Sequence, residues 1–164
     1  MHQSMNGLRA VARVVIQNQA GQILLCRGRS GKTWVAPGGT LDPGEDLAIA
    51  AGREALEEVG LAVTVGPMLY LREFRPADRD EHVIEAGFLA APATLCPEVT
   101  DRVVDLIDQG AGWFIQDVDG PRRECRWFSR EVLAEVTEPV YPRYLRDQFW
   151  EGGGAVYLGL EQGR

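Results

Sequence analysis

Long apolar runs are missing from this sequence, and their absence excludes membrane-spanning helices. No run approaches the roughly 20 consecutive apolar residues that such a helix needs. The opening stretch, MHQSMNGLRA, also lacks the apolar core of a signal peptide. We therefore expect a cytoplasmic protein.

Cysteine and histidine are scarce, which argues against a disulfide framework and a zinc site. The cysteines, Cys26, Cys96 and Cys125, are odd in number and show no CxxC spacing. Cys26 follows the apolar residues ILL, so we expect a buried, unreactive thiol there. The two histidines, His2 and His82, are too far apart in sequence to predict a histidine metal cluster.

Basic clusters are missing as well. The chain has 17 Lys and Arg against 24 Asp and Glu, a formal net charge of −7, and no run of basic residues stands out. Because proteins that bind nucleic-acid backbones show basic patches, we expect neither a nucleic-acid polymer nor a membrane as partner. Small phosphorylated substrates remain compatible with this charge, since bound divalent cations can supply positive charge locally.

What is present is the composition of one globular domain. The 164 residues are 45% hydrophobic and 25% charged, and no internal repeat divides them. We expect a single domain over 1–164, in which 151–164 form a flexible or peripheral tail. In chain order the sequence predicts a hairpin at 9–27, an extended piece at 33–39, a turn at 41–45, a helix at 46–59, strands at 61–74 and 82–91, a short helix at 99–108, a loop or strand at 110–120, a strand at 124–128, and helices at 129–136 and 141–150. This order predicts an α/β fold of the α+β type, with a mixed β-sheet between helices.

The helix expected at 46–59 carries three carboxylates on one face. At about 100° per residue, Glu54, Glu57 and Glu58 fall within one arc, near the C-terminal end where the helix dipole disfavours negative charge. Spacing alone leaves two interpretations open: a solvated acidic surface, or a site for Mg²⁺ or Mn²⁺, which prefer oxygen ligands. On the opposite side we expect an apolar face against the sheet, made of Ala48, Ile49, Ala55, Leu56 and Val59.

The segment around these glutamates resembles the Nudix box of the Nudix (MutT-like) hydrolase family, G-x5-E-x7-R-E-U-x-E-E-x-G-U, where U is a bulky aliphatic residue. Residues 39–61 read GTLDPGEDLAIAAGREALEEVGL, and every fixed glycine, glutamate and arginine is present. Ala55 is smaller than usual at the first U position. The resemblance implies a Nudix-like α/β/α sandwich. It also implies hydrolysis of a nucleoside diphosphate linked to another moiety, with Mg²⁺ or Mn²⁺ and water.

The resemblance also implies roles for individual residues of the box. Glu57 and Glu58 are expected as primary metal ligands, Glu54 as a third ligand or partial base, and the carbonyl of Gly38 as a further ligand. Arg53 is expected to orient a catalytic glutamate through a charge-assisted pair.

The remaining fixed residues of the box are expected to be structural. They are Gly39, Glu45 and Gly60. Glu45 either caps the helix or holds the neighbouring arginine, and Gly60 ends the helix. Gly39 is also expected to border the substrate, in the glycine loop before the helix.

In this family the general base is often a glutamate outside the box. Glu124, directly before CRWF, is our candidate, with Glu81, Glu85 and Glu98 as rivals whose ordinary role would be on a surface or in a strand. For substrate contacts the candidates are Arg27 and Arg29, of which we expect one to reach phosphate. A base is expected to stack on Trp34, and the alternatives for stacking are Phe74, Trp113 and Trp127.

The substrate is less sharply indicated. Pro76 follows Leu61 by 15 residues, which resembles a mark of ADP-ribose pyrophosphatases, although loops commonly contain proline. ADP-ribose or a similar nucleotide sugar is therefore our first expectation, and a nucleoside triphosphate is the alternative. A nucleotide sensor that binds without cleavage is disfavoured because all box carboxylates are present. Family members are frequently dimers, so a homodimer is a further expectation.

Overall fold

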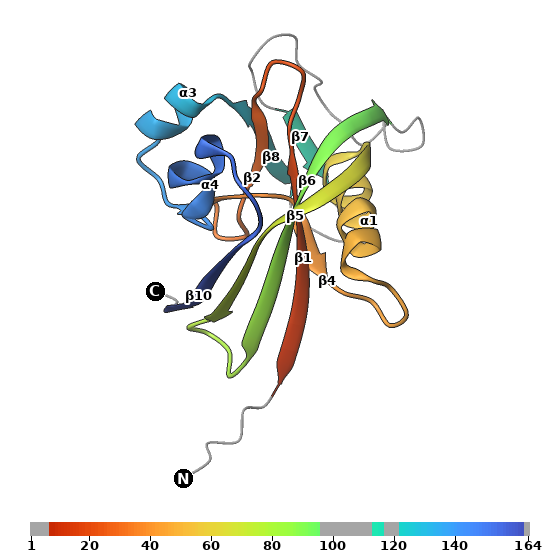
Figure 1. The fold of residues 1–164 in the computed structure, drawn as a ribbon, viewed down its shortest axis with the longest axis vertical. Coiled ribbons are helices and arrows are strands. Elements are labelled where there is room, and N and C mark those ends of the chain that lie inside the picture. The colour runs from red at the N-terminus through yellow and green to blue at the C-terminus, as the bar shows by residue number, and fades with distance from the viewer. Residues whose placement is uncertain (1–6, 96–112, 117–121, 163–164) are drawn as a thin grey trace.

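The computed structural model describes residues 7–95, 113–116 and 122–162. Within these ranges the chain forms two five-stranded sheets and a few helices (Figure 1). None of the described helices is long and apolar enough to cross a membrane. Cys96, Glu98 and the helix expected at 99–108 lie outside the described residues.

The first sheet, sheet A, carries the longest strands. Its members are β1 (Leu8–Ile16), β4 (Gly38–Thr40), β5 (Leu61–Arg75), β6 (His82–Leu95) and β10 (Val156–Gln162). Their spatial order is β10-β5-β6-β1-β4. β1 runs parallel to β6 and antiparallel to β4, while β5 runs antiparallel to β6 and parallel to β10, so the sheet is mixed.

The second sheet, sheet B, is built from shorter strands. Its members are β2 (Ile23–Arg27), β3 (Trp34–Val35), β7 (Trp113–Gln116), β8 (Arg122–Phe128) and β9 (Val140–Tyr141). Their spatial order is β7-β8-β2-β3-β9, and only the β3–β9 pair is parallel.

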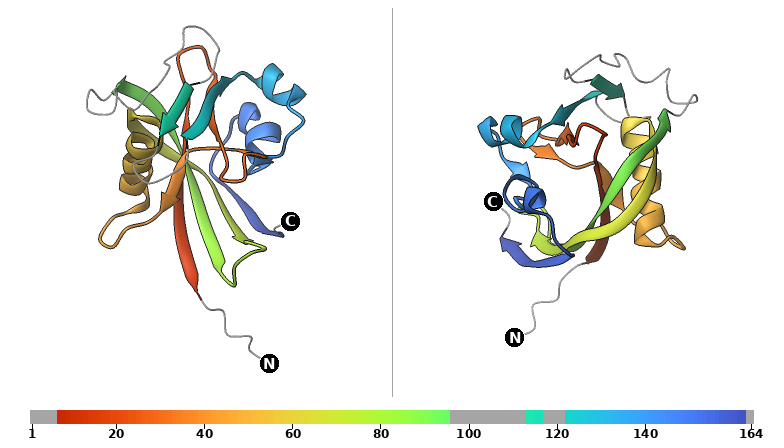
Figure 2. Two further views of the ribbon diagram at one scale, coloured as in Figure 1. Left: turned by 180° about the vertical axis from the view of Figure 1, so that it is seen from behind. Right: turned by 45° about the horizontal axis from the view of Figure 1, so that its top comes forward.

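Helices lie on two sides of these sheets. They are α1 (Leu47–Val59), α3 (Arg130–Glu135), α4 (Tyr144–Asp147) and a 3₁₀ turn, η1 (Phe149–Glu151). Both views in Figure 2 show α1 on one side of the strands and α3 with α4 on the other. The expected α+β fold with mixed sheets and flanking helices is confirmed, with two sheets where the sequence had predicted one.

Local signals explain where α1 begins and ends. The Asp46 side chain accepts a hydrogen bond from the backbone N–H of Ile49 at 2.8 Å, and Gly60 takes the left-handed conformation that ends many helices. The buried side consists of Ala50, Ala51, Glu54, Ala55 and Val59. The expected packing of Ile49 on the sheet is wrong, because its side chain is 58% exposed. It lies two residues, about 200°, from Ala51 on the buried face.

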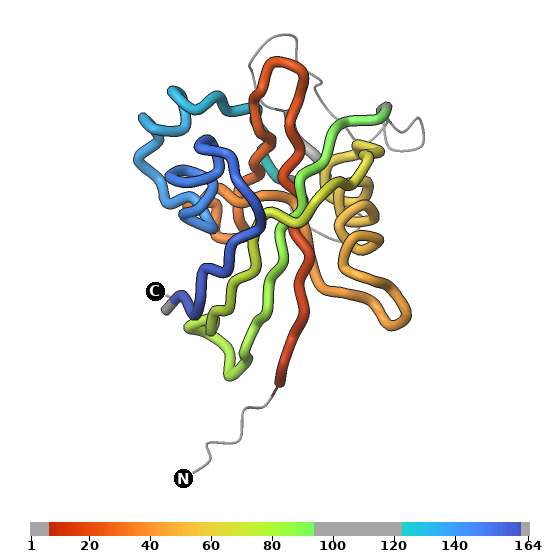
Figure 3. Tube along the Cα trace, in the orientation of Figure 1, coloured from red at the N-terminus to blue at the C-terminus, as the bar shows by residue number. Residues whose placement is uncertain are grey.

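The expected hairpin of β1 and β2 is only partly present. The turn forms, with the backbone N–H of Asn18 donating to the carbonyl of Gln22 at 3.0 Å. However, the bridge between the two runs joins Gln17, just after β1, to Ile23, and β1 and β2 belong to different sheets. Figure 3 shows the course of the chain through this turn. Each strand finds longer partners elsewhere, since β1 pairs with β6 along its whole length.

The core has two parts, one on either side of β1 and β2. Val14 and Leu24 face the cluster beneath α1, whereas Val15 and Leu25 face the cluster beneath α3 and α4. Alternate residues of a strand point to opposite faces, so a run of apolar residues is expected where both faces are buried.

Cys26 and Cys125 belong to the cluster beneath α1. Both are buried, free and directly opposed on β2 and β8, and burial raises the pKa of the Cys26 thiol well above its usual value. The expectation of a buried thiol at Cys26 is confirmed.

The tail expected at 151–164 contains an edge strand, β10. β10 pairs with β5, and Glu161 accepts a hydrogen bond from Arg72 Nη1 at 2.6 Å. The tail is therefore peripheral in position but part of sheet A.

Candidate active site

The three glutamates on α1 differ in their surroundings. Glu54 is almost fully buried, at 9% exposure, while Glu57 is exposed and Glu58 is intermediate. Burial raises the pKa of the Glu54 carboxyl, and the charge of nearby Glu58 raises it further, against the opposing effect of Arg53. This face of the helix is therefore not a uniformly solvated surface.

Arg53 lies at the centre of this acidic group. Its Nε and Nη2 donate to the two carboxylate oxygens of Glu45 at 2.8 and 2.9 Å, and its Nη1 donates to Glu54 and Glu57, each at 3.0 Å. Nη2 also reaches the carbonyl of Thr40 at 3.1 Å. The hydrogen bonds with Arg53 lower the pKa of Glu45. One guanidinium thus joins the turn before α1 to two of its glutamates, and the bidentate pair fixes its plane.

The glycine loop before α1 contacts the other carboxylates. Glu58 Oε2 accepts the backbone N–H of Gly38 at 2.9 Å, and Glu58 Oε1 accepts Arg123 Nη1 at 2.8 Å. The Glu54 carboxylate lies against Gly39 so closely that a Cβ there would be 2.3 Å from Oε1. The loop therefore has room for this carboxylate only because residue 39 is glycine.

A buried ion-pair group supports the same loop from behind. Arg13 Nη1 donates to the carbonyls of Gly38 at 2.8 Å and Ala36 at 3.2 Å, while its Nε donates to Glu85 at 3.1 Å. Glu85 is fully buried and also accepts from Arg72 Nε at 2.7 Å and from the Tyr70 hydroxyl at 3.1 Å. Burial alone would raise the Glu85 pKa, but the two arginines outweigh it and the pKa is lowered.

A cavity of about 730 Å³ opens beside α1 and collects these groups. Glu54, Glu57 and Glu58 line it together with Gly38 and Gly39. Arginines from several other elements also line it, and they are Arg9, Arg13, Arg29, Arg79 and Arg123. Arg53 on α1 and two aspartates, Asp42 and Asp78, complete the charged lining, so the cavity brings the α1 carboxylates together with arginines from other elements.

Three residues expected at the site lie elsewhere. Trp34 is 1% exposed, packs edge-on against Phe128 and is covered by the Arg27 guanidinium 4.0 Å from its ring centre. Arg27 donates to Glu124 at 3.2 Å and is absent, with Trp34 and Glu124, from the described lining of the cavity. Trp34 is a core residue in this structure, and the stacking of a base on its ring stays a prediction.

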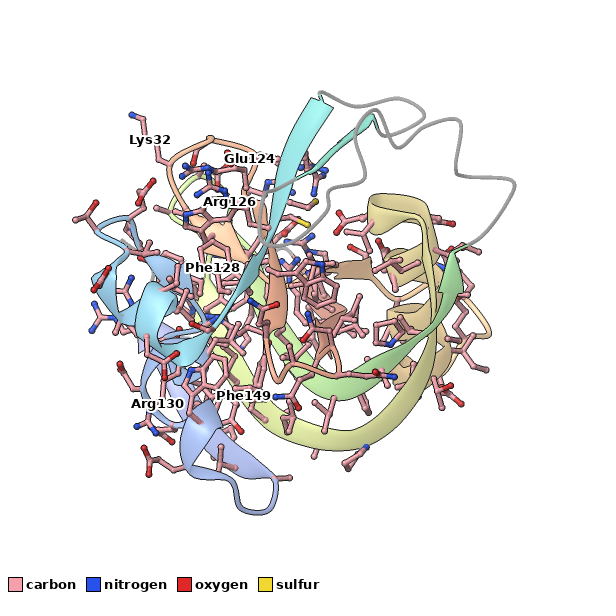
Figure 4. All side chains as sticks on the ribbon, turned by 90° about the horizontal axis from the view of Figure 1, so that it is seen from above. Lys32, Glu124, Arg126, Phe128, Arg130 and Phe149 are labelled. Carbon is pink, nitrogen blue, oxygen red and sulfur yellow. The ribbon has the colours of Figure 1, made fainter. Side chains whose placement is uncertain are left out.

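Glu124 is held on the far side of β8. Its second oxygen pairs with Arg126 Nε at 3.0 Å. Figure 4 shows Glu124 and Arg126 near the loop that carries Lys32, away from α1. Of the rival bases, Glu85 is committed to its ion pairs and Glu81 pairs with Arg9 at 3.2 Å.

Other expected residues do reach the cavity. Arg29, Phe74 and Pro76 line it, and the Arg72 guanidinium lies 4.6 Å from the centre of the Phe74 ring. Trp127 instead packs against the core beneath α1, and the side chain of Trp113 lies outside the described part of the structure.

The sequence reasoning missed Arg13 and Arg123. Arg13 carried a usable signal, because it is a lone charge within the apolar run AVARVVI, and a charge in a buried strand needs a partner. Arg123 gave no such signal, since its partner Glu58 is 65 residues away along the chain.

The donors around Glu58 suit a hard divalent cation, since they are carboxylate and carbonyl oxygens. Within the described residues, however, no three acidic, cysteine or histidine side chains converge closely enough to hold an ion. In this structure Arg53 pairs with Glu54 and Glu57, and Arg123 pairs with Glu58. The donor set fits Mg²⁺ or Mn²⁺ in its chemistry.

Comparison with known proteins agrees with this geometry. The family model for the NUDIX domain matches residues 7–148. The chain belongs to the NUDIX domain family. The segment that resembles the Nudix box runs from β4 through the following turn and α1 to the start of β5.

Relatives share parts of this sequence. A Bacillus subtilis (strain 168) protein, whose name assigns it to the 8-oxo-dGTP diphosphatases, is 39% identical over 76 residues, which are 46% of this chain and 50% of that protein. An RNA pyrophosphohydrolase of Shewanella denitrificans is 43% identical over 56 residues, 34% of this chain and 33% of that protein. The matched region thus spans half or less of these relatives.

Solved structures share the fold over most of the chain. The MutT protein from Bacillus halodurans superposes with a TM-score of 0.65, covering 94% of this chain and 90% of that one at 17% identity. At this identity the likeness shows the fold alone.

Proposed function

We propose that this chain hydrolyses the pyrophosphate bond of a nucleoside diphosphate linked to another moiety. Mg²⁺ or Mn²⁺ is the proposed cofactor, and ADP-ribose or a similar nucleotide sugar is the first candidate substrate. Membership of the NUDIX family supports the reaction class.

One observation carries the proposal: a single cavity brings the three α1 glutamates together with arginines from other elements of the fold. A diphosphate is attracted by the arginines and repelled by the carboxylates. Divalent cations between phosphate and carboxylate remove that repulsion, so this distribution of charge fits a phosphorylated substrate that binds together with metal ions.

In this proposal the glutamates of α1 bind the metal ion and Arg53 positions them. Glu57 and Glu58 would hold the ion, with Glu54 and the Gly38 carbonyl as further ligands. Bound there, the ion would neutralise phosphate charge and lower the pKa of a water molecule. Arg53, fixed by Glu45, would keep two of the glutamates in position.

For the general base, Glu54 is favoured over Glu124. The Glu54 carboxylate lies in the cavity against Gly39, whereas both oxygens of Glu124 are engaged by arginines outside it. A base must come within hydrogen-bond reach of the attacking water, and the position of Glu54 in the cavity supports it for that role.

Arg29 and Phe74 are the proposed substrate contacts. Arg29 lines the cavity and can pair with phosphate, and Phe74 offers a ring on which a base could stack. Pro76 borders the same cavity, which supports ADP-ribose as first candidate. The partial similarity to the Bacillus subtilis diphosphatase supports a nucleoside triphosphate as the second candidate.

The test is a substrate panel with Mg²⁺ or Mn²⁺. Release of phosphate or mononucleotide is measured with ADP-ribose, nucleotide sugars, dinucleoside polyphosphates, nucleoside triphosphates including 8-oxo-dGTP, and RNA with a 5′-triphosphate. Glu58→Gln serves as the blank.

The panel separates the candidates. A preference for ADP-ribose supports the first, and a preference for a triphosphate assigns the chain to the second. Nucleotide binding without turnover of any compound would contradict both and identify a binding protein.

A further inference from the structure

Both carboxylate oxygens of Glu58 already accept a hydrogen bond in this structure. Oε2 accepts the Gly38 N–H at 2.9 Å, and Oε1 accepts Arg123 Nη1 at 2.8 Å. The first bond is to the backbone of the glycine loop, which is itself held by Arg13. The second is to a flexible side chain and is therefore the easier of the two to break.

The Arg123–Glu58 pair joins the two halves of the fold. Arg123 lies on β8 of sheet B, and Glu58 lies on α1, which packs on sheet A. The side chains are only 15% and 13% exposed, so water screens their attraction less than at an open surface. Arg123 also lines the cavity, which gives its guanidinium a place to move.

A divalent cation at the Glu58 carboxylate would lie close to the Arg123 guanidinium, which bonds the same group at 2.8 Å, so the two positive charges repel each other and compete for Glu58. We propose that Arg123 is a displaceable counter-ion: it neutralises Glu58 in the metal-free protein and is released into the cavity when a divalent cation binds Glu58. This inference rests on the proposed function, since it assumes Glu58 as a ligand.

Arg53, unlike Arg123, is not expected to be displaced by the cation. Two of its nitrogens are fixed by Glu45, a residue outside the expected ligand set, so Arg53 can stay in place when the glutamates bind an ion. Release of Arg123, in contrast, frees a positive charge beside the position where phosphate would bind. Cation binding would thereby prepare the cavity for an anionic substrate.

The experiment measures Mn²⁺ binding alone, without substrate, from the electron paramagnetic resonance signal of free Mn²⁺. Arg123→Gln removes the competitor, and we expect Mn²⁺ to bind roughly tenfold more tightly, as for the loss of one charge-assisted hydrogen bond. Arg126→Gln is the matched control, because it removes the same charge from the same strand at a residue that pairs with Glu124 and is 49% exposed. We expect this control to change the affinity less than about twofold.

A second readout is the increase in melting temperature on addition of Mn²⁺, which should be larger in Arg123→Gln than in the wild type. A folded Arg123→Lys protein, which keeps the charge but lacks the fork of donors, should fall between wild type and Arg123→Gln.

The outcomes separate this inference from the proposed function. If the wild type binds Mn²⁺ and Arg123→Gln binds no more tightly than Arg126→Gln, the counter-ion role is refuted while the metal site stands. If the wild type does not bind Mn²⁺, or if Glu58→Gln binds it as well as the wild type, the metal site fails and the counter-ion role fails with it.

Discussion

The Glu54 carboxylate lies so close to Gly39 that a side chain at position 39 would collide with it. In Gly39→Ala the new methyl group would lie 2.3 Å from Oε1, so the carboxylate must move. We expect kcat to fall by about a hundredfold, as for a misplacement near 1 Å at a reacting centre. Steady-state kinetics checks this, and circular dichroism should show an intact fold.

At Gly52 on α1, in contrast to Gly39, we expect that alanine can be accommodated. A Cβ there meets only a methyl group of Val65 at 3.6 Å, an ordinary contact, so alanine fits. Because glycine is a poor helix former, Gly52→Ala should stabilise the protein by about 0.5–1 kcal/mol. Urea denaturation measures the change. A loss of stability would mean that α1 packs more tightly on β5 than this contact indicates.

Glu57→Gln and Glu58→Gln test the acidic face directly. Each keeps the side-chain shape but removes a negative charge, and we expect turnover to fall by about a hundredfold or more while the fold persists. Glu131→Gln, on the exposed face of α3, is the control for the loss of a carboxylate and should keep wild-type rates. Wild-type activity in both α1 variants would contradict the proposed site.

Removal of the charge on Glu85 should be costly for stability. Glu85→Gln leaves Arg13 and Arg72 without a buried counter-charge, and we expect a loss of about 3–5 kcal/mol in the free energy of unfolding. Glu161→Gln breaks a more exposed pair with Arg72 and should cost at most about 1 kcal/mol. Denaturant titration of both variants distinguishes the two effects.

The Glu85 carboxylate should make the free energy of unfolding depend on pH in a direction that its pKa predicts. Its folded pKa lies below the ordinary value of 4.5, since Arg13 and Arg72 outweigh burial, which acts in the opposite direction. The carboxylate therefore stabilises the fold fully above pH 4.5, and this contribution is lost as pH falls through the folded pKa. The stability difference between wild type and Glu85→Gln should be constant near neutrality and shrink in acid. A constant difference down to pH 3 would contradict this.

The parts of the fold that local sequence decides were predictable. Asp46 and Gly60 mark the ends of α1, and Ser129 caps α3 by accepting from the N–H of Val132 at 3.3 Å. Such signals act within a few residues, so a single sequence contains them. The position of the acidic face on α1 follows from the same helical geometry.

The parts decided by long-range pairing were not predictable in this way. β1 and β2 are neighbours in sequence, yet they join different sheets because β6 and β8 offer longer pairings. The sequence likewise suggested Trp34 as a ring for a base, but packing against Phe128 takes it into the core. Neither outcome has a local cause.

The hydrogen-bonded series from Glu161 through Arg72, Glu85 and Arg13 to the Gly38 carbonyl crosses sheet A from its edge to the glycine loop. The series also depends on the register of β10. If that strand slipped by one residue, an alkyl chain or an amide would face Arg72 in place of the Glu161 carboxylate, because neighbouring side chains point to opposite faces. The sheet thus penalises misalignment of the last strand electrostatically, at a point linked to the proposed chemistry.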